Sequence, residues 1–331
     1  MKGLHYTMRK TQLLLNEMRT ISVVVPVYNE EDNIDIIYDR VFRAVDSIQS
    51  RYNAKLLFID NNSGDKTKDK IQAIAGKDKR VQAIFNAKNF GFVRSSFYGL
   101  IQATGDAVIM LYADLQAPPE LIPELVRQWE NGFKIVIGVK NKSKENPIMH
   151  CFRKMYYKLI KKISDVEQIE HYDGFGLYDR SFIEVLKQLD DPIPYLRGIV
   201  SELGYKRTEV FYEQKEREFG KSKWNFFQLY DFAFLGITSY SKVLLRLATF
   251  VGFFVAFCSI IVAIITFIQK IINWDDYPAG NTAIIVGIFF LGAVQLIFIG
   301  IMGEYIMNIN TRILKRPLVI EEKRINMDEE V

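Results

Sequence analysis

Two kinds of hydrophobic pattern divide the chain. Over about its first two thirds, short β-branched runs alternate with stretches whose apolar residues recur at helical spacing. We expect strands at residues 21–26, 55–60, 81–85, 107–112 and 134–139, separated by helices at 31–51, 65–75, 93–104 and 119–131. Strands that alternate with helices in this way predict an α/β fold with a mostly parallel sheet and flanking helices.

The remaining third is far more apolar. Residues 247–268 and 282–303 contain no charged side chain, and each run exceeds about 18 residues, a length that indicates a membrane-spanning helix. We therefore expect two transmembrane helices rather than two buried core helices. Basic residues lie before the first run and after the second, namely Lys242, Arg246, Arg312, Lys315 and Arg316. The positive-inside rule then predicts a multi-pass protein of the cell membrane with its polar part and both termini in the cytoplasm.

These patterns predict five parts. Residues 1–18 form an N-terminal appendage, whose longest apolar run is too short for a signal peptide. Residues 19–222 form a cytoplasmic α/β domain, and residues 223–242 form an aromatic, amphipathic segment expected at the membrane interface. Residues 243–308 form the two-helix transmembrane hairpin, and residues 309–331 form a cytoplasmic tail.

Composition excludes several classes of protein. The net charge is only +4, from 43 basic and 39 acidic residues, which argues against a nucleic-acid binder. The two cysteines, Cys151 and Cys258, lie in different parts of the chain, so a disulfide framework is excluded. The three histidines are far apart and do not indicate a zinc site.

Polar residues follow four successive predicted strands. The segments are 26–31, 60–65, 86–91 and 113–116, and they carry carboxylates, amides and glycine. Each segment alone is ordinary turn chemistry. Because ligands bind at the carboxyl ends of the strands in such sheets, four such segments in order predict one polar site at one edge.

At these segments the sequence resembles the family 2 glycosyltransferases of GT-A fold. More narrowly, it resembles the polyisoprenyl-phosphate glycosyltransferases, which are the dolichyl-phosphate mannose synthases and bactoprenol glucosyltransferases. The resemblance runs from about residue 20 to residue 317. Its most specific pieces are Ala-Asp-Leu-Gln-x-Pro-Pro-Glu at 113–120 and Arg-x-x-Gly-x-Ser-Lys at 217–223, and it also includes Val-Val-Pro-Val-Tyr-Asn-Glu-Glu at 24–31 and Asn-Phe-Gly at 89–91.

The resemblance implies roles for residues at matching positions. Donor nucleotide-sugar binding is expected of Pro26, Tyr28, Glu30, Asp60, Asn61, Lys88, Asn89, Gly91, Asp114 and Lys140. Lipid-phosphate binding is expected of Arg153, Arg197, Arg217, Ser222 and Lys223, with catalytic roles for Asp114, Asp173, Arg217 and Lys223. Asp114 and Gln116 would hold a metal cofactor, and hard oxygen ligands suit Mg²⁺ or Mn²⁺.

Three departures from the family pattern affect these expectations. Tyr112 stands where the family's Asp-x-Asp has its first aspartate, so one metal carboxylate is missing. Asn61 replaces the second aspartate of the usual Asp-Asp-Gly. The usual Gly-Asp-Phe-Arg appears as Asp-Gly-Phe-Gly at 173–176, which displaces the carboxylate by one position and loses the arginine. Asp173 is therefore open to either a catalytic or a turn role.

The implied reaction is inverting transfer of a sugar from a nucleotide-sugar to polyprenyl phosphate, for cell-envelope glycan modification. A uridine donor carrying a hexose or N-acetylhexosamine is expected, the bilayer and a separate flippase are expected partners, and a homo-oligomer is possible. Two alternatives stay open. One is a processive polysaccharide synthase, although the Gln-x-x-Arg-Trp string of those enzymes is absent. The other is a membrane scaffold that binds nucleotide-sugar without turnover.

Overall fold

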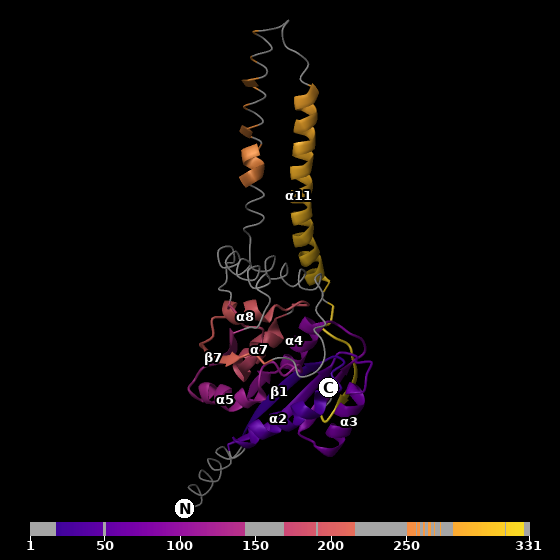
Figure 1. The fold of residues 1–331 in the computed structure, drawn as a ribbon, viewed down its shortest axis with the longest axis vertical. Coiled ribbons are helices and arrows are strands. Elements are labelled where there is room, and N and C mark those ends of the chain that lie inside the picture. The colour runs from indigo at the N-terminus through magenta and orange to yellow at the C-terminus, as the bar shows by residue number, and fades with distance from the viewer. Residues whose placement is uncertain are drawn as a thin grey trace, which may run out of the picture. The chain divides into compact units, whose positions relative to one another are not determined.

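The computed structural model describes residues 18–48, 51–142, 169–189, 191–215, 250–255, 257–258, 261, 264–265, 268, 272, 281–314 and 316–327. It divides into two units, one formed by residues 1–154, 167–225 and 315–331 and the other by residues 155–166 and 226–314. The first unit is built on a sheet (Figure 1) whose strands are β1 (Arg19–Val27), β2 (Tyr52–Asp60), β3 (Val81–Asn86), β4 (Ala107–Met110), β5 (Ile135–Lys142), β6 (Gly176–Asp179), β7 (Arg207–Glu213) and β8 (Glu321–Ile325).

Among the described residues, the sheet has eight strands in the order β7-β5-β6-β4-β1-β2-β3-β8. Strands β4, β1, β2 and β3 run parallel to one another, and β5 runs parallel to β7. Strand β6 lies antiparallel between β4 and β5, and β8 lies antiparallel to β3 at one edge. The predicted α/β fold with a mostly parallel sheet is confirmed, and the five predicted strands correspond to β1–β5.

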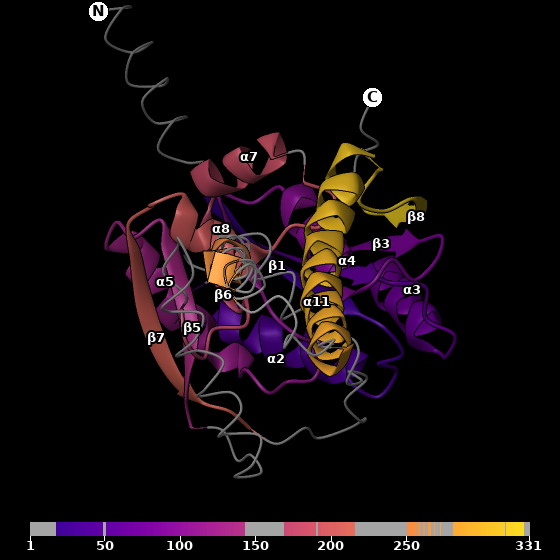
Figure 2. The same ribbon diagram turned by 90° about the horizontal axis from the view of Figure 1, so that it is seen from above.

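Helices cover both faces of the sheet (Figures 1 and 2). One face carries α2 (Ile34–Asp46), α3 (Thr67–Lys77) and α5 (Ile122–Glu130), and the other carries α4 (Phe92–Gln102), α7 (Arg180–Gln188) and α8 (Leu196–Glu202). Short 3-10 helix η1 (Pro119–Leu121) precedes α5. The four predicted helices correspond to α2, α3, α4 and η1 with α5.

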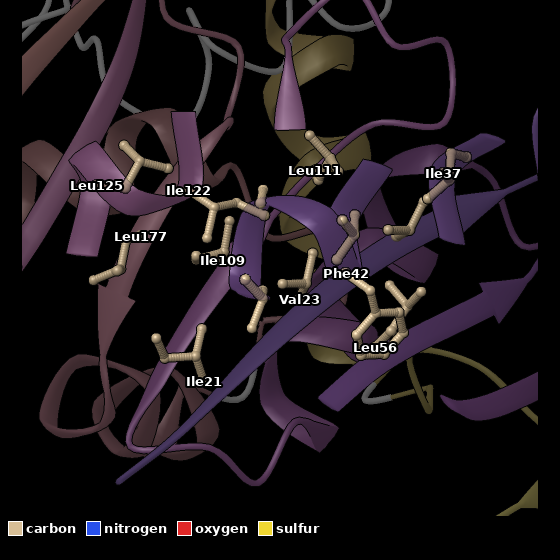
Figure 3. Close-up of a cluster of buried hydrophobic side chains, with 14 of the residues drawn as sticks. Ile21, Val23, Ile37, Phe42, Leu56, Ile109, Leu111, Ile122, Leu125 and Leu177 are labelled. Carbon is tan, nitrogen blue, oxygen red and sulfur yellow. The ribbon is translucent and has the colours of Figure 1, made fainter. Parts of the chain in front are cut away.

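Buried side chains explain why these segments form these elements. Every residue of β1 from Ile21 to Val27 is buried, as expected for a β-branched strand covered on both faces. In α2, the buried residues Ile34, Ile37 and Val41 recur at helical spacing, so one face of the helix packs on the sheet. Figure 3 shows this core, in which residues of β1 and β4 meet side chains of α2 and α5.

The second unit contains helix α11 (Asn281–Ile313), which covers the second predicted apolar run. Within the described residues there is one helical stretch long and apolar enough to cross a membrane, Phe290–Ile313. The first predicted run is described only in part, and its described residues are helical. Residues 1–17, 143–168 and 216–249, which include most of the appendage and the interfacial segment, lie outside the described residues.

The segment that follows α11 contributes a strand that its own pattern does not predict. Residues 321–325 form β8, which pairs with β3 and extends the sheet of the first unit. A sequence of Glu-Glu-Lys-Arg-Ile has little apolar character, and charged edge strands of this kind are common in natural sheets. Residues 321–325 of the predicted tail are therefore part of the sheet of the first unit.

Candidate active site

The predicted polar segments meet at one edge of the sheet. They follow β1, β2, β3 and β4, whose carboxyl ends lie side by side because these four strands are parallel. The chain order reverses at β1, with β2 on one side and β4 on the other, which is the point where ligands bind in open α/β sheets. We call this edge the rim, meaning residues 28–31, 61–65, 86–92 and 112–116 together with Lys140 and Asp173, which reach the same edge from β5 and from the loop before β6.

Each rim loop contains a residue with positive φ. Asn29, Asn62, Gly91 and Leu115 have φ values of 53°, 64°, 86° and 54° in the loops after β1, β2, β3 and β4. Leucine adopts this region rarely, and the side chain of Leu115 is buried. Backbone conformations of this kind concentrate at functional sites, where the surrounding structure holds them.

The loops after β1 and β2 are held together by reciprocal hydrogen bonds. The amide of Asn29 donates to Ser63 Oγ at 2.8 Å, and the amide of Gly64 donates to Asn29 Oδ1 at 2.8 Å. Beneath them Asp60 is completely buried and accepts hydrogen bonds from the amide and hydroxyl of Ser63. Burial raises the pKa of Asp60, against the effect of these hydrogen bonds. Asp60 thus fixes the position of Ser63 in the loop after β2.

An amide cluster joins the loops after β2 and β3. Asn86 Nδ2 donates to Asn61 Oδ1 at 3.1 Å, and Asn61 Nδ2 donates to Asn89 Oδ1 at 2.8 Å. The backbone amide of Phe90 also donates to Asn61 Oδ1, at 2.9 Å. Asn61 uses both the donor and the acceptor of its carboxamide here, which an aspartate could not do. The departure at position 61 therefore has a structural reason.

The loop after β4 carries Asp114. Its Oδ1 accepts the amide of Gln116 at 3.2 Å, which closes a tight turn around Leu115. At the start of this loop the Tyr112 hydroxyl donates to the backbone carbonyl of Asp173 at 2.7 Å. Burial, followed by the nearby carboxylate of Asp173, raises the pKa of Tyr112 well above its ordinary value. Tyr112 is thus a neutral hydrogen-bond donor that ties the loop before β6 to the end of β4.

Gly174 makes room for this contact. It has a φ of 110°, and a Cβ at this position would lie 2.4 Å from the Tyr112 hydroxyl oxygen. A side chain at residue 174 would therefore displace Tyr112. Tyr112 and Gly174, the two positions where the family pattern has carboxylates, are sterically coupled in this chain.

Asp173 and Lys140 form an ion pair at the rim. Lys140 Nζ lies 2.8 Å from Asp173 Oδ2, and the two side chains are 18% and 22% exposed. Lys140 belongs to β5, and Asp173 lies just before β6, the strand that pairs with both β4 and β5. The antiparallel insertion of β6 is what brings Asp173 to the same edge as Asp114.

Tyr212 was not predicted from the sequence. It lies on β7 and packs edge-on against Phe175, with ring centroids 5.4 Å apart. Its buried hydroxyl has no hydrogen-bond partner among the described residues. Burial raises its pKa, and the carboxylates of Asp173 and Asp114 are close enough to add to this effect. The alternation of side chains between the two faces of β7, which places Tyr212 on the same face as Val210, is the one sequence signal that could have identified Tyr212.

The other predicted site residues have these positions. Tyr28 and Lys88 are exposed at the rim, and Glu30 accepts a hydrogen bond from Asn33 Nδ2 at 2.7 Å. Pro26 is buried near the end of β1. Arg197 lies on α8, close enough to Tyr112 to oppose the rise in its pKa. The remaining predicted residues lie outside the described part of the chain, namely Arg153, Arg217, Ser222 and Lys223.

Comparison with known proteins decides the family. A bactoprenol glucosyl transferase from a Shigella flexneri prophage is 36% identical over 304 residues, which is 92% of this chain and 97% of that protein. The profile of "Glycosyl transferase family 2" matches residues 22–186. This chain belongs to glycosyl transferase family 2. The predicted family is confirmed, the protein is a glycosyltransferase, and its α/β fold is of the GT-A type.

Two further relatives match nearly as much of this chain. The prophage bactoprenol glucosyl transferase homolog of Escherichia coli is 36% identical over 91% of this chain and 97% of its own. The putative glycosyltransferase CsbB of Bacillus subtilis is 34% identical over 92% of both chains. These likenesses extend through the rim into the apolar part, so they concern the whole architecture rather than the α/β domain alone.

The rim carries oxygen donors of the kind that bind a divalent cation. Asp114 and Gln116 place a carboxylate and a carboxamide in one turn. Within the described part of the chain, no group of three or more His, Cys, Asp or Glu could hold a metal by itself. Magnesium typically binds one or two carboxylates together with substrate phosphates, so two protein oxygen donors suffice. The Tyr112 hydroxyl keeps its proton, which it donates to a backbone carbonyl, and so supplies no anionic oxygen.

Proposed function

We propose that this glycosyltransferase transfers a sugar from a nucleotide-sugar to a polyprenyl phosphate at the cytoplasmic surface of the cell membrane. The observation that supports this most is the likeness to bactoprenol glucosyl transferases over nearly their whole length. We further propose a uridine donor carrying a hexose or N-acetylhexosamine. The two apolar runs would form a transmembrane hairpin, with residues 223–242 at the interface.

The rim supplies the groups that this reaction needs. The bond from the sugar C1 to the donor diphosphate breaks, and the nucleoside diphosphate leaves with the electron pair. Lys140 would stabilise the charge that develops on this leaving group, and Asp173 would hold Lys140 in place through their 2.8 Å contact. Asp114 and Gln116 would hold Mg²⁺ or Mn²⁺, which when bound neutralises part of the same charge.

The acceptor needs little activation. A phosphate monoester has a second pKa of about 6, so at neutral pH it is mostly a dianion and is already nucleophilic. A phosphate oxygen attacks C1 from the face opposite the leaving group, which inverts the configuration. No strong general base is required, unlike transfer to a sugar hydroxyl. We therefore assign Asp173 to the positioning of Lys140 rather than to proton abstraction.

The acceptor phosphate would bind basic residues of the predicted lipid site. Arg217 and Lys223 match the family's phosphate-binding string, and Arg153 and Arg197 are further candidates. The polyprenyl tail stays in the bilayer, which requires the rim to lie near the membrane surface. Two spans are too few to form a translocation path of their own, so a separate flippase would carry the product across.

The experiment is a donor panel. Membranes containing the protein are incubated with labelled UDP-glucose, UDP-galactose and UDP-N-acetylglucosamine, and then extracted with organic solvent. Label in a polyprenyl-monophosphate sugar supports the proposal, and the donor that gives label identifies the sugar. Label in a long polymer would instead indicate a processive synthase, and binding of donor without any labelled product would indicate a scaffold.

A further inference from the structure

After α11, the chain returns to the sheet and borders the rim. Residues 316–327, which we call the return segment, pair with β3 along Ala83–Asn86 in antiparallel register. Beyond the end of β3, the amide of Ala87 donates to the carbonyl of Ile320 at 2.9 Å. Figure 2 shows β8 lying beside β3 at the edge of the sheet. The return segment therefore borders the rim loop 86–91 as well as the strand before it.

Two side chains tie the return segment to the rim. A guanidinium nitrogen of Arg94 donates to the carbonyl of Pro317, and the same guanidinium lies over the ring of Phe90, 5.5 Å from its centroid. Lys68 Nζ donates to Asn62 Oδ1 at 2.8 Å and lies 3.4 Å from Glu322 Oε2. Arg94 thus connects the return segment to the loop after β3, and Lys68 connects it to the loop after β2.

The far end of the segment is attached separately. Asn326 Nδ2 donates to the carbonyls of Ala75 and Val81 at 2.7 and 2.8 Å. Gln82 Nε2 donates to the carbonyl of Asn326 at 2.9 Å. These contacts lie at the amino end of β3, away from the rim, so the two ends of the segment can be tested independently.

The loop between β3 and α4 depends on outside contacts for its shape. Residues 87–89 and Gly91 are exposed, and Gly91 has a φ of 86°. Asn61 holds the loop on the side of β2 through Asn89 and the amide of Phe90. Arg94, Pro317 and Ile320 hold it on the opposite side. Among the described contacts, the return segment thus adds a second set of restraints on the loop to those of the amide cluster.

We propose that the return segment is a positioning element of the donor nucleotide site, acting through the loop 86–91. This deepens the proposed function and rests on it, because the same loop carries Lys88, Asn89 and Gly91, which we expect to contact the nucleotide-sugar. A loop held in its binding conformation loses less entropy when the ligand binds, so releasing it weakens nucleotide affinity without removing any contacting group.

The test compares the two ends of the segment in the full-length protein in detergent. Arg94→Met removes the guanidinium contacts with Pro317 and Phe90 and keeps the apolar stem of the side chain. Arg94→Lys restores a cationic donor, and Asn326→Ala, which removes the side-chain contacts at the far end, is the matched control. The measurements are the dissociation constant for UDP, hydrogen exchange of the amides of residues 86–91, and the midpoint of thermal unfolding.

We expect Arg94→Met to raise the UDP dissociation constant about five- to tenfold, as the loss of one charge-assisted hydrogen bond predicts, and to speed amide exchange at 86–91. Arg94→Lys recovers part of the affinity. Asn326→Ala lowers the unfolding midpoint and leaves UDP affinity unchanged.

Unchanged exchange and unchanged UDP affinity in Arg94→Met would overturn the inference, as would equal losses of affinity in Arg94→Met and Asn326→Ala. A separate outcome concerns the proposed function. Faster exchange at 86–91 in Arg94→Met, with no binding of UDP by the unsubstituted protein, would uphold the return segment's hold on the loop and contradict the uridine donor.

Discussion

The ion pair between Lys140 and Asp173 offers the sharpest mutational test of the rim. Its nitrogen and oxygen are 2.8 Å apart, and the side chains are 18% and 22% exposed. Exposed pairs contribute about 0.2–1 kcal/mol, and breaking a fully buried pair costs about 3–5 kcal/mol. This pair lies between those limits, so we expect a coupling free energy of about 1–2 kcal/mol in a double-mutant cycle with Lys140→Met and Asp173→Asn.

The two substitutions should have opposite effects on how well the protein uses or binds the nucleotide. Lys140→Met removes a cation from the developing diphosphate, and we expect kcat/KM for the donor to fall about 100-fold. Asp173→Asn removes the carboxylate that competes with the diphosphate for Lys140. We therefore expect the dissociation constant for UDP to fall about threefold, with turnover reduced only as far as Lys140 becomes less ordered.

A second ion pair, next to the other end of β5, provides the control. Lys134 Nζ lies 3.1 Å from Asp179 Oδ1, just before β5 and therefore at the opposite edge of the sheet. Lys134→Met should lower the unfolding midpoint and leave kcat/KM unchanged. The assay is initial-rate transfer to lipid, with UDP affinity measured by calorimetry. Near-normal transfer by Lys140→Met, or unchanged transfer by Asp173→Asn, would refute the assigned roles.

Three further predictions follow from individual contacts. Tyr112→Phe removes the hydrogen bond to a partly buried carbonyl and should cost about 1–3 kcal/mol of stability together with about tenfold in transfer. Tyr52→Phe, which loses a 2.7 Å hydrogen bond far from the rim, should cost stability alone, and equal transfer rates in the two variants would contradict this. Asp114→Asn should weaken Mn²⁺ binding in the presence of UDP, measured by electron paramagnetic resonance, and an unchanged signal would exclude Asp114 as a ligand. The Arg80 guanidinium lowers the pKa of Asp78 to about 2, against the effect of burial. Because the pKa of Asp78 is lower in the folded than in the unfolded protein, where it is about 4, the ionised carboxylate stabilises the fold above pH 4. This stabilisation is lost as the pH falls toward 2. Between these pH values the midpoint of thermal unfolding of Asp78→Asn should therefore fall less than that of the unsubstituted protein.

The parallel part of the fold could be predicted because buried parallel strands are continuous apolar runs. Strands β1 to β4 are of this kind, and a helix separates each of them from the next along the chain. Strand β6 has four residues, and β8 is a charged edge strand, so neither shows a clear pattern of its own. Both depend on pairing with strands that are distant in the sequence, which local periodicity does not report.

The candidate site, like the fold, could be predicted only where it depends on the parallel strands. The order of polar segments after the parallel strands indicates the rim, because those carboxyl ends must lie together. The contact of Asp173 with Tyr112 and Lys140 depends on the antiparallel insertion of β6 between β4 and β5, which the sequence does not reveal. Tyr212 and the return segment were missed for the same reason. The predicted contacts of the rim residues with nucleotide and metal stay predictions.

The central claim is transfer of a sugar alone to a polyprenyl phosphate, and its products distinguish it from other lipid glycosylations. The purified protein, reconstituted in lipid nanodiscs with undecaprenyl phosphate, would be supplied with the donor that the panel identifies. The account predicts release of a nucleoside diphosphate in equal amount to a lipid product containing one phosphate, and only when undecaprenyl phosphate is present. Release of a nucleoside monophosphate with a two-phosphate lipid, or release that does not depend on the acceptor, would contradict it.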